Sequence, residues 1–171
     1  MDRGLVHLYC GDGKGKTTAA LGLALRAAGS GMRVHFVQFL KGGETSELAS
    51  LTRIPEITVL RCSRNFGFTF NMTAADKAAV TECHNEMLRT IRERLPETDL
   101  LVLDEFFAAY NHRLMDCTLA GQLIADCEAE LVLTGRDPAE QFLELADYVS
   151  EICAVKHPYT RGISARKGIE F

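Results

Sequence analysis

Near the N-terminus the chain reads Gly11-Asp12-Gly13-Lys14-Gly15-Lys16-Thr17-Thr18. An apolar run, residues 5–10, precedes this stretch, and a run rich in Ala and Leu, residues 17–28, follows it. A glycine-rich connection that joins a strand to a helix and ends in Gly-Lys-Thr is typical of a P-loop. The sequence therefore predicts a phosphate-binding loop at this position.

The chemistry of the loop agrees with this prediction. Glycines let successive backbone N–H groups turn towards phosphate oxygens, and the N-terminus of the following helix adds partial positive charge. Lys16 can reach the outer phosphates of a nucleotide, and the hydroxyl of Thr17 can bind Mg²⁺. The strict pattern has a further glycine where this chain has Cys10, so the loop is a variant. The alternative is a glycine-rich turn without a ligand.

A second motif supplies carboxylates. The apolar run 100–103 ends in Asp104 and Glu105, an arrangement that provides a direct or indirect Mg²⁺ ligand in P-loop proteins. The alternative is a strand followed by a polar turn. Because adjacent residues of a strand point to opposite sides, we expect only one of the two carboxylates to face the metal. Arg136 follows a later apolar run, and we expect it to contact phosphate, with a surface salt bridge as the alternative.

Apolar runs of strand length alternate along the chain with longer segments of helical period. The predicted strands are residues 5–10, 33–39, 57–61, 100–103, 130–134 and 148–155. The predicted helices are residues 17–28, a helix capped by Thr73 that ends near Leu95, residues 119–127, and a helix opened by Asp137-Pro138 that ends near Ala146. The alternation predicts one α/β domain over residues 1–171, with a mostly parallel sheet covered on both faces.

Composition excludes several classes of protein. The 171 residues include 19 Lys and Arg against 23 Asp and Glu, so no basic surface predicts nucleic-acid binding. The six cysteines form no Cys-x-x-Cys pair, and we expect all of them to be reduced thiols. The N-terminus does not resemble a signal peptide, and no apolar run is long enough to span a bilayer. We therefore expect a cytoplasmic protein without nucleic-acid or membrane partners.

Three segments show no clear period: residues 41–53, 63–72 and 156–171. Loops of this length in a compact domain are often functional. Between the second and the third, Cys83 and His84 are adjacent in a predicted helix. Adjacent helical residues point about 100° apart, so we interpret this pair as structural rather than as a metal site.

Further motifs extend over almost the whole chain. They are Val37-Gln38-Phe39-Leu40-Lys41-Gly42, Gly67-Phe68-Thr69-Phe70, Val102-Leu103-Asp104-Glu105, Thr134-Gly135-Arg136, and Lys156-His157-Pro158-Tyr159 followed by Gly162, Ala165 and Gly168-Ile169-Glu170. With these motifs and the variant P-loop, the chain resembles the P-loop ATP:corrinoid adenosyltransferases, also called cob(I)alamin or cob(I)yrinic acid a,c-diamide adenosyltransferases. The resemblance implies a three-layer α/β architecture, the RecA-like P-loop NTPase fold.

The resemblance also implies an activity. The 5′-deoxyadenosyl group of ATP would pass to the cobalt(I) of a reduced corrinoid such as cobalamin, with release of triphosphate, in adenosylcobalamin synthesis or salvage. Residues 11–17 would bind the triphosphate, with Lys16 as a catalytic residue. Thr17 and Glu105 would bind Mg²⁺, with Asp104 beside them. ATP would bind in a reversed sense that exposes its 5′ carbon.

Two aromatic residues are assigned to the corrinoid by the same resemblance. Phe68 and Phe70 match the pair that shields the lower face of the ring and would count as catalytic residues. Apolar rings there exclude the lower axial ligand, which makes cobalt(II) easier to reduce. Relatives commonly have Trp at the second position, so Phe70 offers a smaller apolar wall. From the residues alone, Phe66, Phe68 and Phe70 are alternating core residues of a short strand.

The resemblance further implies a homodimer and a flavoprotein electron donor. Some relatives carry an N-terminal extension over the corrinoid site, and here the first predicted strand begins a few residues after Met1, so we expect the corrinoid contacts to differ.

Two other functions share the same nucleotide site. A P-loop small-molecule kinase or ATPase would release ADP or phosphate, whereas a nucleotide-gated corrinoid carrier would bind corrinoid tightly without turnover.

Overall fold

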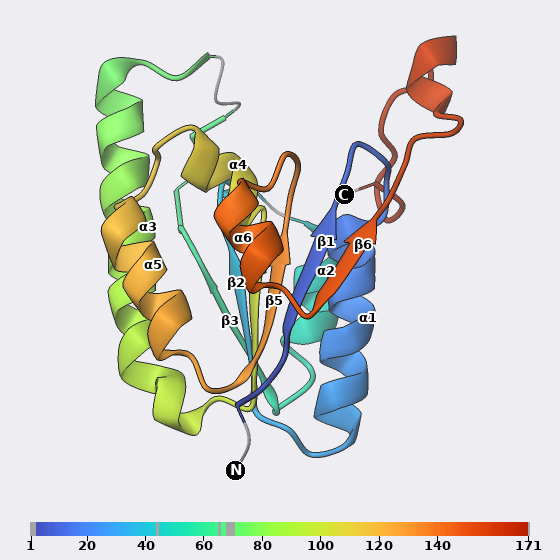
Figure 1. Cartoon of the computed structure of the whole chain (residues 1–171). Helices are drawn as coiled ribbons and strands as arrows, with labels where there is room; N and C mark the ends of the chain where they lie inside the picture. Colours follow the sequence, from blue (N-terminus) through green and yellow to red (C-terminus); the bar gives the residue numbers. More distant parts are fainter. Residues whose placement is uncertain (1–2, 44, 65, 68–70, 171) are drawn as a thin grey trace.

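Short parallel strands form the centre of the molecule. The computed structural model describes residues 3–43, 45–64, 66–67 and 71–170, and these contain a six-stranded sheet in the order β3-β2-β4-β5-β1-β6 (Figure 1). The strands are β1 (Val6–Cys10), β2 (Val34–Gln38), β3 (Ile57–Arg61), β4 (Leu100–Asp104), β5 (Glu130–Thr134) and β6 (Tyr148–Glu151). All pairings are parallel. The predicted strands are thus confirmed, and the last one is shorter than expected because it ends at Glu151.

Helices cover both faces of this sheet. On one face lie α1 (Lys16–Gly29) and α2 (Ser46–Leu51), and on the other lie α3 (Ala74–Arg94), α4 (Phe106–Asn111), α5 (Cys117–Asp126) and α6 (Glu140–Leu145) (Figure 1). Two 3-10 turns, η2 (Leu95–Glu97) and η3 (Pro158–Arg161), follow α3 and β6. The three-layer α/β architecture is therefore confirmed. In the part of the chain that the structure describes, no helix has the length and apolar character to cross a membrane.

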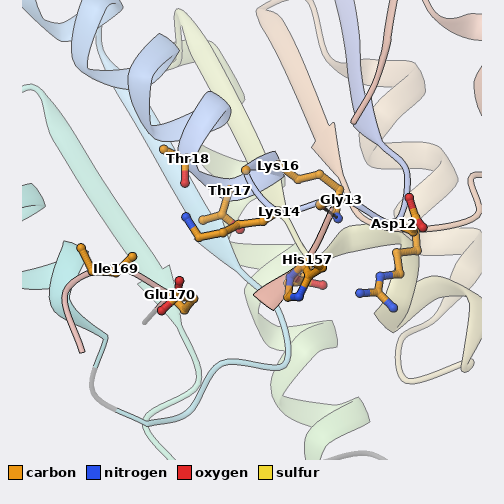
Figure 2. A pocket seen from close by; sticks show the side chains of 12 residues that line it. Asp12, Gly13, Lys14, Lys16, Thr17, Thr18, His157, Ile169 and Glu170 are labelled. Carbon is orange, nitrogen blue, oxygen red and sulfur yellow. Dashed lines mark hydrogen bonds between the residues drawn. The ribbon is translucent and has the colours of Figure 1, made fainter. Parts of the chain in front are cut away.

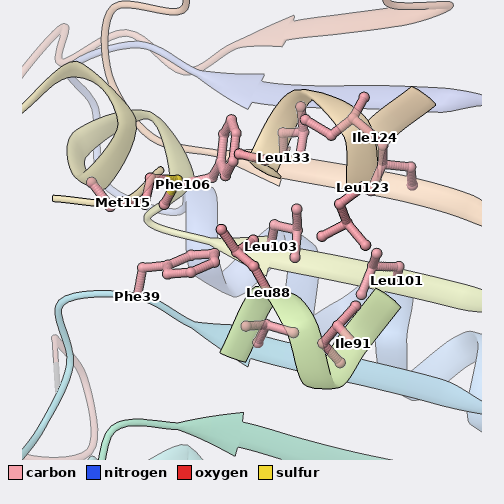
Figure 3. Close-up of a cluster of buried hydrophobic side chains, with 14 of the residues drawn as sticks. Phe39, Leu88, Ile91, Leu101, Leu103, Phe106, Met115, Leu123, Ile124 and Leu133 are labelled. Carbon is pink, nitrogen blue, oxygen red and sulfur yellow. The ribbon is translucent and has the colours of Figure 1, made fainter. Parts of the chain in front are cut away.

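The two layers of helices pack on alternate side chains of the central strands. Along β4, Val102 faces α1 and α2, whereas Leu101 and Leu103 face the opposite layer, as the period of a strand requires. Figure 3 shows this second and larger core, in which Leu88 of α3 and Leu123 of α5 meet the sheet. A strand buried on both faces has no polar side, which explains the continuous apolar runs in the sequence.

The predicted capping residues can be compared with the N-termini of α3 and α6. Thr73 caps α3 and forms a capping box, in which its hydroxyl accepts from the Asp76 amide and the Asp76 carboxylate accepts from the Thr73 amide. The predicted opening of α6 at Asp137-Pro138 is wrong, because Ala139 is the N-cap residue and Asp137 has a positive φ of 51°, whereas the predicted helix end near Ala146 is confirmed. The Asp137 carbonyl instead accepts a hydrogen bond from the Asn111 side-chain amide, which holds it in the turn before the helix.

The P-loop is fastened to the segment that follows β6. The Gly13 amide donates to the Ile152 carbonyl at 2.7 Å, and the Ile152 amide donates to the Cys10 carbonyl at 2.8 Å. One carboxylate oxygen of Asp12 accepts from the Ala154 amide at 3.0 Å. A Cβ atom at Gly13 would lie 2.6 Å from the Ile152 carbonyl oxygen. Glycine at position 13 is therefore required by close backbone contact.

Two of the cysteines are joined. Cys62, at the end of β3, forms a disulfide with Cys83 of α3, so the expectation that all six thiols are reduced is wrong for this pair. The residues are 21 positions apart, and the fold brings them together where α3 packs beneath the sheet. Cys10, Cys117, Cys127 and Cys153 are free. No sequence spacing reveals such a pairing, because it depends on the packing of two separate elements.

The disulfide can be tested by counting free thiols before and after reduction. Protein purified without reductant, denatured and treated at once with a thiol reagent is expected to show four reactive thiols, because the other two are bonded to each other. After reduction the number should rise to six, and peptide mapping should recover a fragment that joins Cys62 to Cys83. Six reactive thiols before reduction would contradict the pairing.

Close packing at Gly13 predicts a cost for any side chain there. We expect Gly13→Ala to lower the free energy of unfolding by about 1–3 kcal/mol, because the new methyl group overlaps the Ile152 carbonyl oxygen. Gly22→Ala is the matched control, since Gly22 lies exposed in α1 with no neighbour near its Cβ position. The control should raise stability by about 0.5–1 kcal/mol. Urea unfolding of both variants measures the difference, and equal midpoints would refute the close contact.

Candidate active site

A polar cavity of about 200 Å³ opens at the carboxyl ends of β1 and β4. It is lined by the P-loop from Asp12 to Thr18, by Glu105 and Arg136, and by His157, Ile169 and Glu170 of the C-terminal tail (Figure 2). The structure thus brings together the residues that the P-loop motif, the carboxylate motif and the Thr-Gly-Arg turn predicted. Gly11 and Asp104 do not line this cavity, and they lie beside residues that do.

The N-terminus of α1 faces this cavity without a side-chain cap. Gly15 is the N-cap residue, with a φ of 122° that only glycine adopts readily, and among the residues that the structure describes no side chain caps the first amides of the helix. The first N–H groups of a helix need partners from outside the helix. These amides, together with the partial positive charge of the helix end, suit a phosphate group.

Three basic side chains, Lys14, Lys16 and Arg136, line this cavity and add positive charge. The Lys16 ammonium donates to the Gly13 carbonyl at 2.7 Å and so lies folded over the loop. Burial, and then the nearby guanidinium of Arg136, lower the pKa of Lys16. Arg136 is exposed and makes no ion pair with any residue that the structure describes. The cavity therefore presents three cationic side chains, whose charge an anionic ligand would neutralise.

Asp104 connects three parts of the site. Its side chain is completely buried, and one oxygen accepts from the hydroxyl groups of Thr17 at 2.9 Å and Thr134 at 2.8 Å. The other oxygen accepts from the Lys41 ammonium at 2.8 Å. The carboxylate thus joins the first turn of α1, the end of β5 and the segment after β2. A buried carboxylate is tolerated only when it is bonded in this way.

Glu105 also lines the cavity, although it follows Asp104 directly. It has the left-handed conformation, with φ 58° and ψ 24°, and its amide donates to the Thr134 hydroxyl at 2.9 Å. The strand ends at Asp104, so strict alternation of the two side chains does not apply. Burial, followed by the charge of Asp104, raises the pKa of Glu105. Thr17, Asp104 and Glu105 together offer the hard oxygen donors that Mg²⁺ prefers.

A second cavity of about 360 Å³ adjoins the first between α1, α2 and the C-terminal tail. Thr17, Thr18, Ile169 and Glu170 line both cavities. Lys41 and Glu47 line the second cavity and not the first. The site is therefore continuous across the first turn of α1.

The C-terminal tail is a part of the site to which sequence reasoning gave no definite role. Glu170 forms an ion pair with Arg166 at 3.0 Å, and hydrogen bonds from Arg166 lower the pKa of the Glu170 carboxylate. His157, which belongs to the tail motif Lys156-His157-Pro158-Tyr159, lines the cavity and accepts from the Tyr159 amide at 3.2 Å. The tail has no periodic pattern, so only its motif pointed to the site.

The structure describes only part of the aromatic segment, residues 66–70. Phe68 and Phe70, assigned to the corrinoid, lie outside the described residues. Phe66 packs against Met72, Val80 and Leu114, and the Arg64 guanidinium lies 5.1 Å from the centre of its ring. Phe66 is therefore a half-buried residue that packs on the core, but it lies outside every strand that the structure describes, so its assignment to a short strand is wrong.

Comparison with solved structures identifies the fold. A KaiC-like protein of the archaeon Pyrococcus horikoshii superposes with a TM-score of 0.55 over 88% of this chain and 72% of its own, at 19% sequence identity. Identity at this level is informative about architecture alone. The RecA-like P-loop fold expected from the sequence is confirmed.

Comparison with other sequences identifies the family. The family described as ATP:corrinoid adenosyltransferase BtuR/CobO/CobP matches residues 2–171. A corrinoid adenosyltransferase of Pseudomonas aeruginosa is 33% identical over 99% of this chain and 85% of its own length. The corrinoid adenosyltransferase CobA of Salmonella typhimurium is 32% identical over 99% and 87%. The polar cavity at the N-terminus of α1 and the P-loop fold around it are consistent with these sequence matches. The chain is an enzyme of the ATP:corrinoid adenosyltransferase family.

Proposed function

We propose that this protein transfers the 5′-deoxyadenosyl group of ATP to the cobalt(I) of a reduced corrinoid and releases triphosphate, in adenosylcobalamin synthesis or salvage. One observation carries the proposal beyond family membership: the uncapped N-terminus of α1 lies beside Lys16 and Arg136 in one cavity. This arrangement suits a long, highly charged phosphate chain. It suits equally a leaving group whose charge grows during the reaction.

The reaction needs no general base from the protein. Cobalt(I) is itself the nucleophile, and its electron pair forms the bond to the 5′ carbon of ATP. The bond from that carbon to the triphosphate oxygen breaks, and its electrons leave with the triphosphate. The protein must hold the 5′ carbon in line with cobalt and stabilise the charge on the departing oxygens. In this proposal the amides of the first turn of α1, together with Lys16 and Arg136, perform the second task.

Magnesium belongs to the same proposal. Thr17 and Glu105 would bind the ion, with Asp104 beside them, because their hydroxyl and carboxylate oxygens fit its chemistry. When bound, Mg²⁺ neutralises part of the charge on the phosphate chain. The buried carboxylate of Asp104 fixes the orientation of the Thr17 hydroxyl.

Phe68 and Phe70 would shield the lower face of the corrinoid. Their segment leads from β3 to α3, and Phe66 and Met72 on either side of it pack on Val80 of α3. Phe66 and Met72 are thus fixed against α3, which supports the proposal that the residues between them present apolar rings to a planar ligand. A homodimer, a flavoprotein electron donor and a cytoplasmic location complete the proposal, and they are supported by the family resemblance.

Two other functions remain as alternatives to be tested. A small-molecule kinase or ATPase would use the same phosphate cavity and release ADP or phosphate. A nucleotide-gated carrier would bind the corrinoid without turnover. Neither alternative produces intact triphosphate, so the identity of the product separates all three.

The role of Lys16 predicts the first experiment. Anaerobic mixing of the protein with MgATP and chemically reduced corrinoid should abolish the cobalt(I) absorption and yield an alkyl-cobalt product and triphosphate. Lys16→Ala is expected to slow this transfer by about 100-fold or more, because it removes a cation that stabilises the leaving group. Lys77→Ala is the control, since Lys77 is exposed on α3. Unchanged spectra with accumulation of ADP would support the kinase instead.

The shielding role of Phe68 predicts a difference between two assays. Phe68→Ala is expected to reduce the rate of the cobalt(II)-dependent reaction more than the rate with cobalt(I) supplied, because the ring acts on the reduction step. Phe68→Leu is the control, since it keeps an apolar side chain at this position. Equal losses in both assays would remove the shielding role.

A further inference from the structure

Lys41 lies beside two of the residues that the proposed function places at the Mg²⁺ site, Asp104 and Thr17. Its ammonium is 2.8 Å from one carboxylate oxygen of Asp104 and 3.4 Å from the hydroxyl oxygen of Thr17. It also lies 3.9 Å from a carboxylate oxygen of Glu47. The side chain of Lys41 is 24% exposed and that of Asp104 is fully buried. A cation of the protein itself therefore satisfies Asp104.

The backbone around Lys41 is held from two sides. Leu40 has a positive φ of 59°, which is unfavourable for a residue with a side chain. Its amide donates to Nε2 of His84 at 3.2 Å, while Nδ1 of the same ring donates to the Leu114 carbonyl at 2.7 Å. His84 is completely buried, so this neutral imidazole is a fixed part of the core. The strained turn is thus maintained by the packing of α3.

Arg61 fixes the other side of the turn. One guanidinium nitrogen donates to the Lys41 carbonyl at 2.7 Å and also to the Gly43 carbonyl. Two independent anchors, one from α3 and one from β3, therefore hold the backbone that carries the Lys41 side chain. Its position is built into the fold and is not the chance conformation of an exposed lysine.

Glu47 provides a second partner for the ammonium. It lies in α2 and accepts from the side-chain amide of Gln38, which is fully buried. Burial alone would raise the pKa of Glu47, but its own backbone amide, Gln38 and Lys41 outweigh this and lower it. Glu47 is therefore a carboxylate beside Lys41 that does not bond to Thr17 or Asp104. The ammonium keeps a counter-charge if another cation takes its place at Asp104.

We propose that Lys41 is a positioning residue that competes with Mg²⁺ for Asp104 and Thr17 in the nucleotide-free site. In this state Lys41 neutralises Asp104 and reduces the affinity of the site for free divalent cations. When the metal arrives together with the phosphate chain, Glu47 remains as the partner of Lys41. The consequence is that metal and nucleotide bind together, and the empty enzyme does not hold a metal ion. The inference rests on the proposed function only for the assignment of Mg²⁺ to the site that contains Thr17 and Asp104.

The test measures metal binding without nucleotide, corrinoid or turnover. Mn²⁺ is titrated into the nucleotide-free protein, and free Mn²⁺ is followed by its electron paramagnetic resonance signal. Lys41→Met is expected to bind Mn²⁺ about tenfold or more tightly than the wild type. The substitution removes a positive charge that lies within a few ångströms of the ligand oxygens and repels the cation. Lys41→Arg should restore the wild-type affinity, since it keeps the positive charge.

Lys77→Met is the matched control for the change in net charge. Lys77 is exposed on α3, so its loss should leave Mn²⁺ affinity unchanged. Circular dichroism verifies that each variant is folded, and Lys41→Gln replaces Lys41→Met if that variant is not. Equal or weaker Mn²⁺ binding by a folded neutral variant would overturn the inference. Failure to form triphosphate in the transfer assay would instead overturn the proposed function and leave the competition at Asp104 intact.

Discussion

The buried carboxylate of Asp104 is the constraint on which the rest of the site depends. Transfer of a carboxylate from water into a protein interior is costly unless donors replace the lost water. Here three donors come from three different parts of the chain: Thr17 of α1, Thr134 of β5 and Lys41 after β2. The first turn of α1 is therefore placed relative to two strand ends at once, although β1 and β4 are separated in the sheet by β5.

The chain carries a net charge of -4 and still builds an anion site. Backbone amides make this possible, since they attract phosphate oxygens without adding formal charge. The basic side chains of the site act within a short range, because acidic partners lie close to them, as Glu105 does to Lys16. An acidic surface and a site for a polyanion are therefore compatible, provided that the positive groups are local and partly buried.

Local patterns were sufficient to predict the strands, α1, the Thr73 cap and both nucleotide motifs. Each depends on neighbours in the sequence, such as an apolar run followed by glycines or by carboxylates. Helices α2 and α4 have only six residues each, and the left-handed turn at Glu105 has no sequence signal, so these were not predicted. The disulfide and the contacts of Lys41 join distant segments, and they arise only from tertiary packing.

The position of β6 has a consequence for the dynamics of the P-loop. All its side chains are exposed, and it pairs only with β1 at the margin of the sheet. A margin that buries so little apolar surface opens more readily than the central strands. Because the Gly13 amide bonds to the Ile152 carbonyl just beyond this strand, fraying of the margin would release the loop as well. Opening of the phosphate-binding loop is thus coupled to local unfolding at the edge of the sheet.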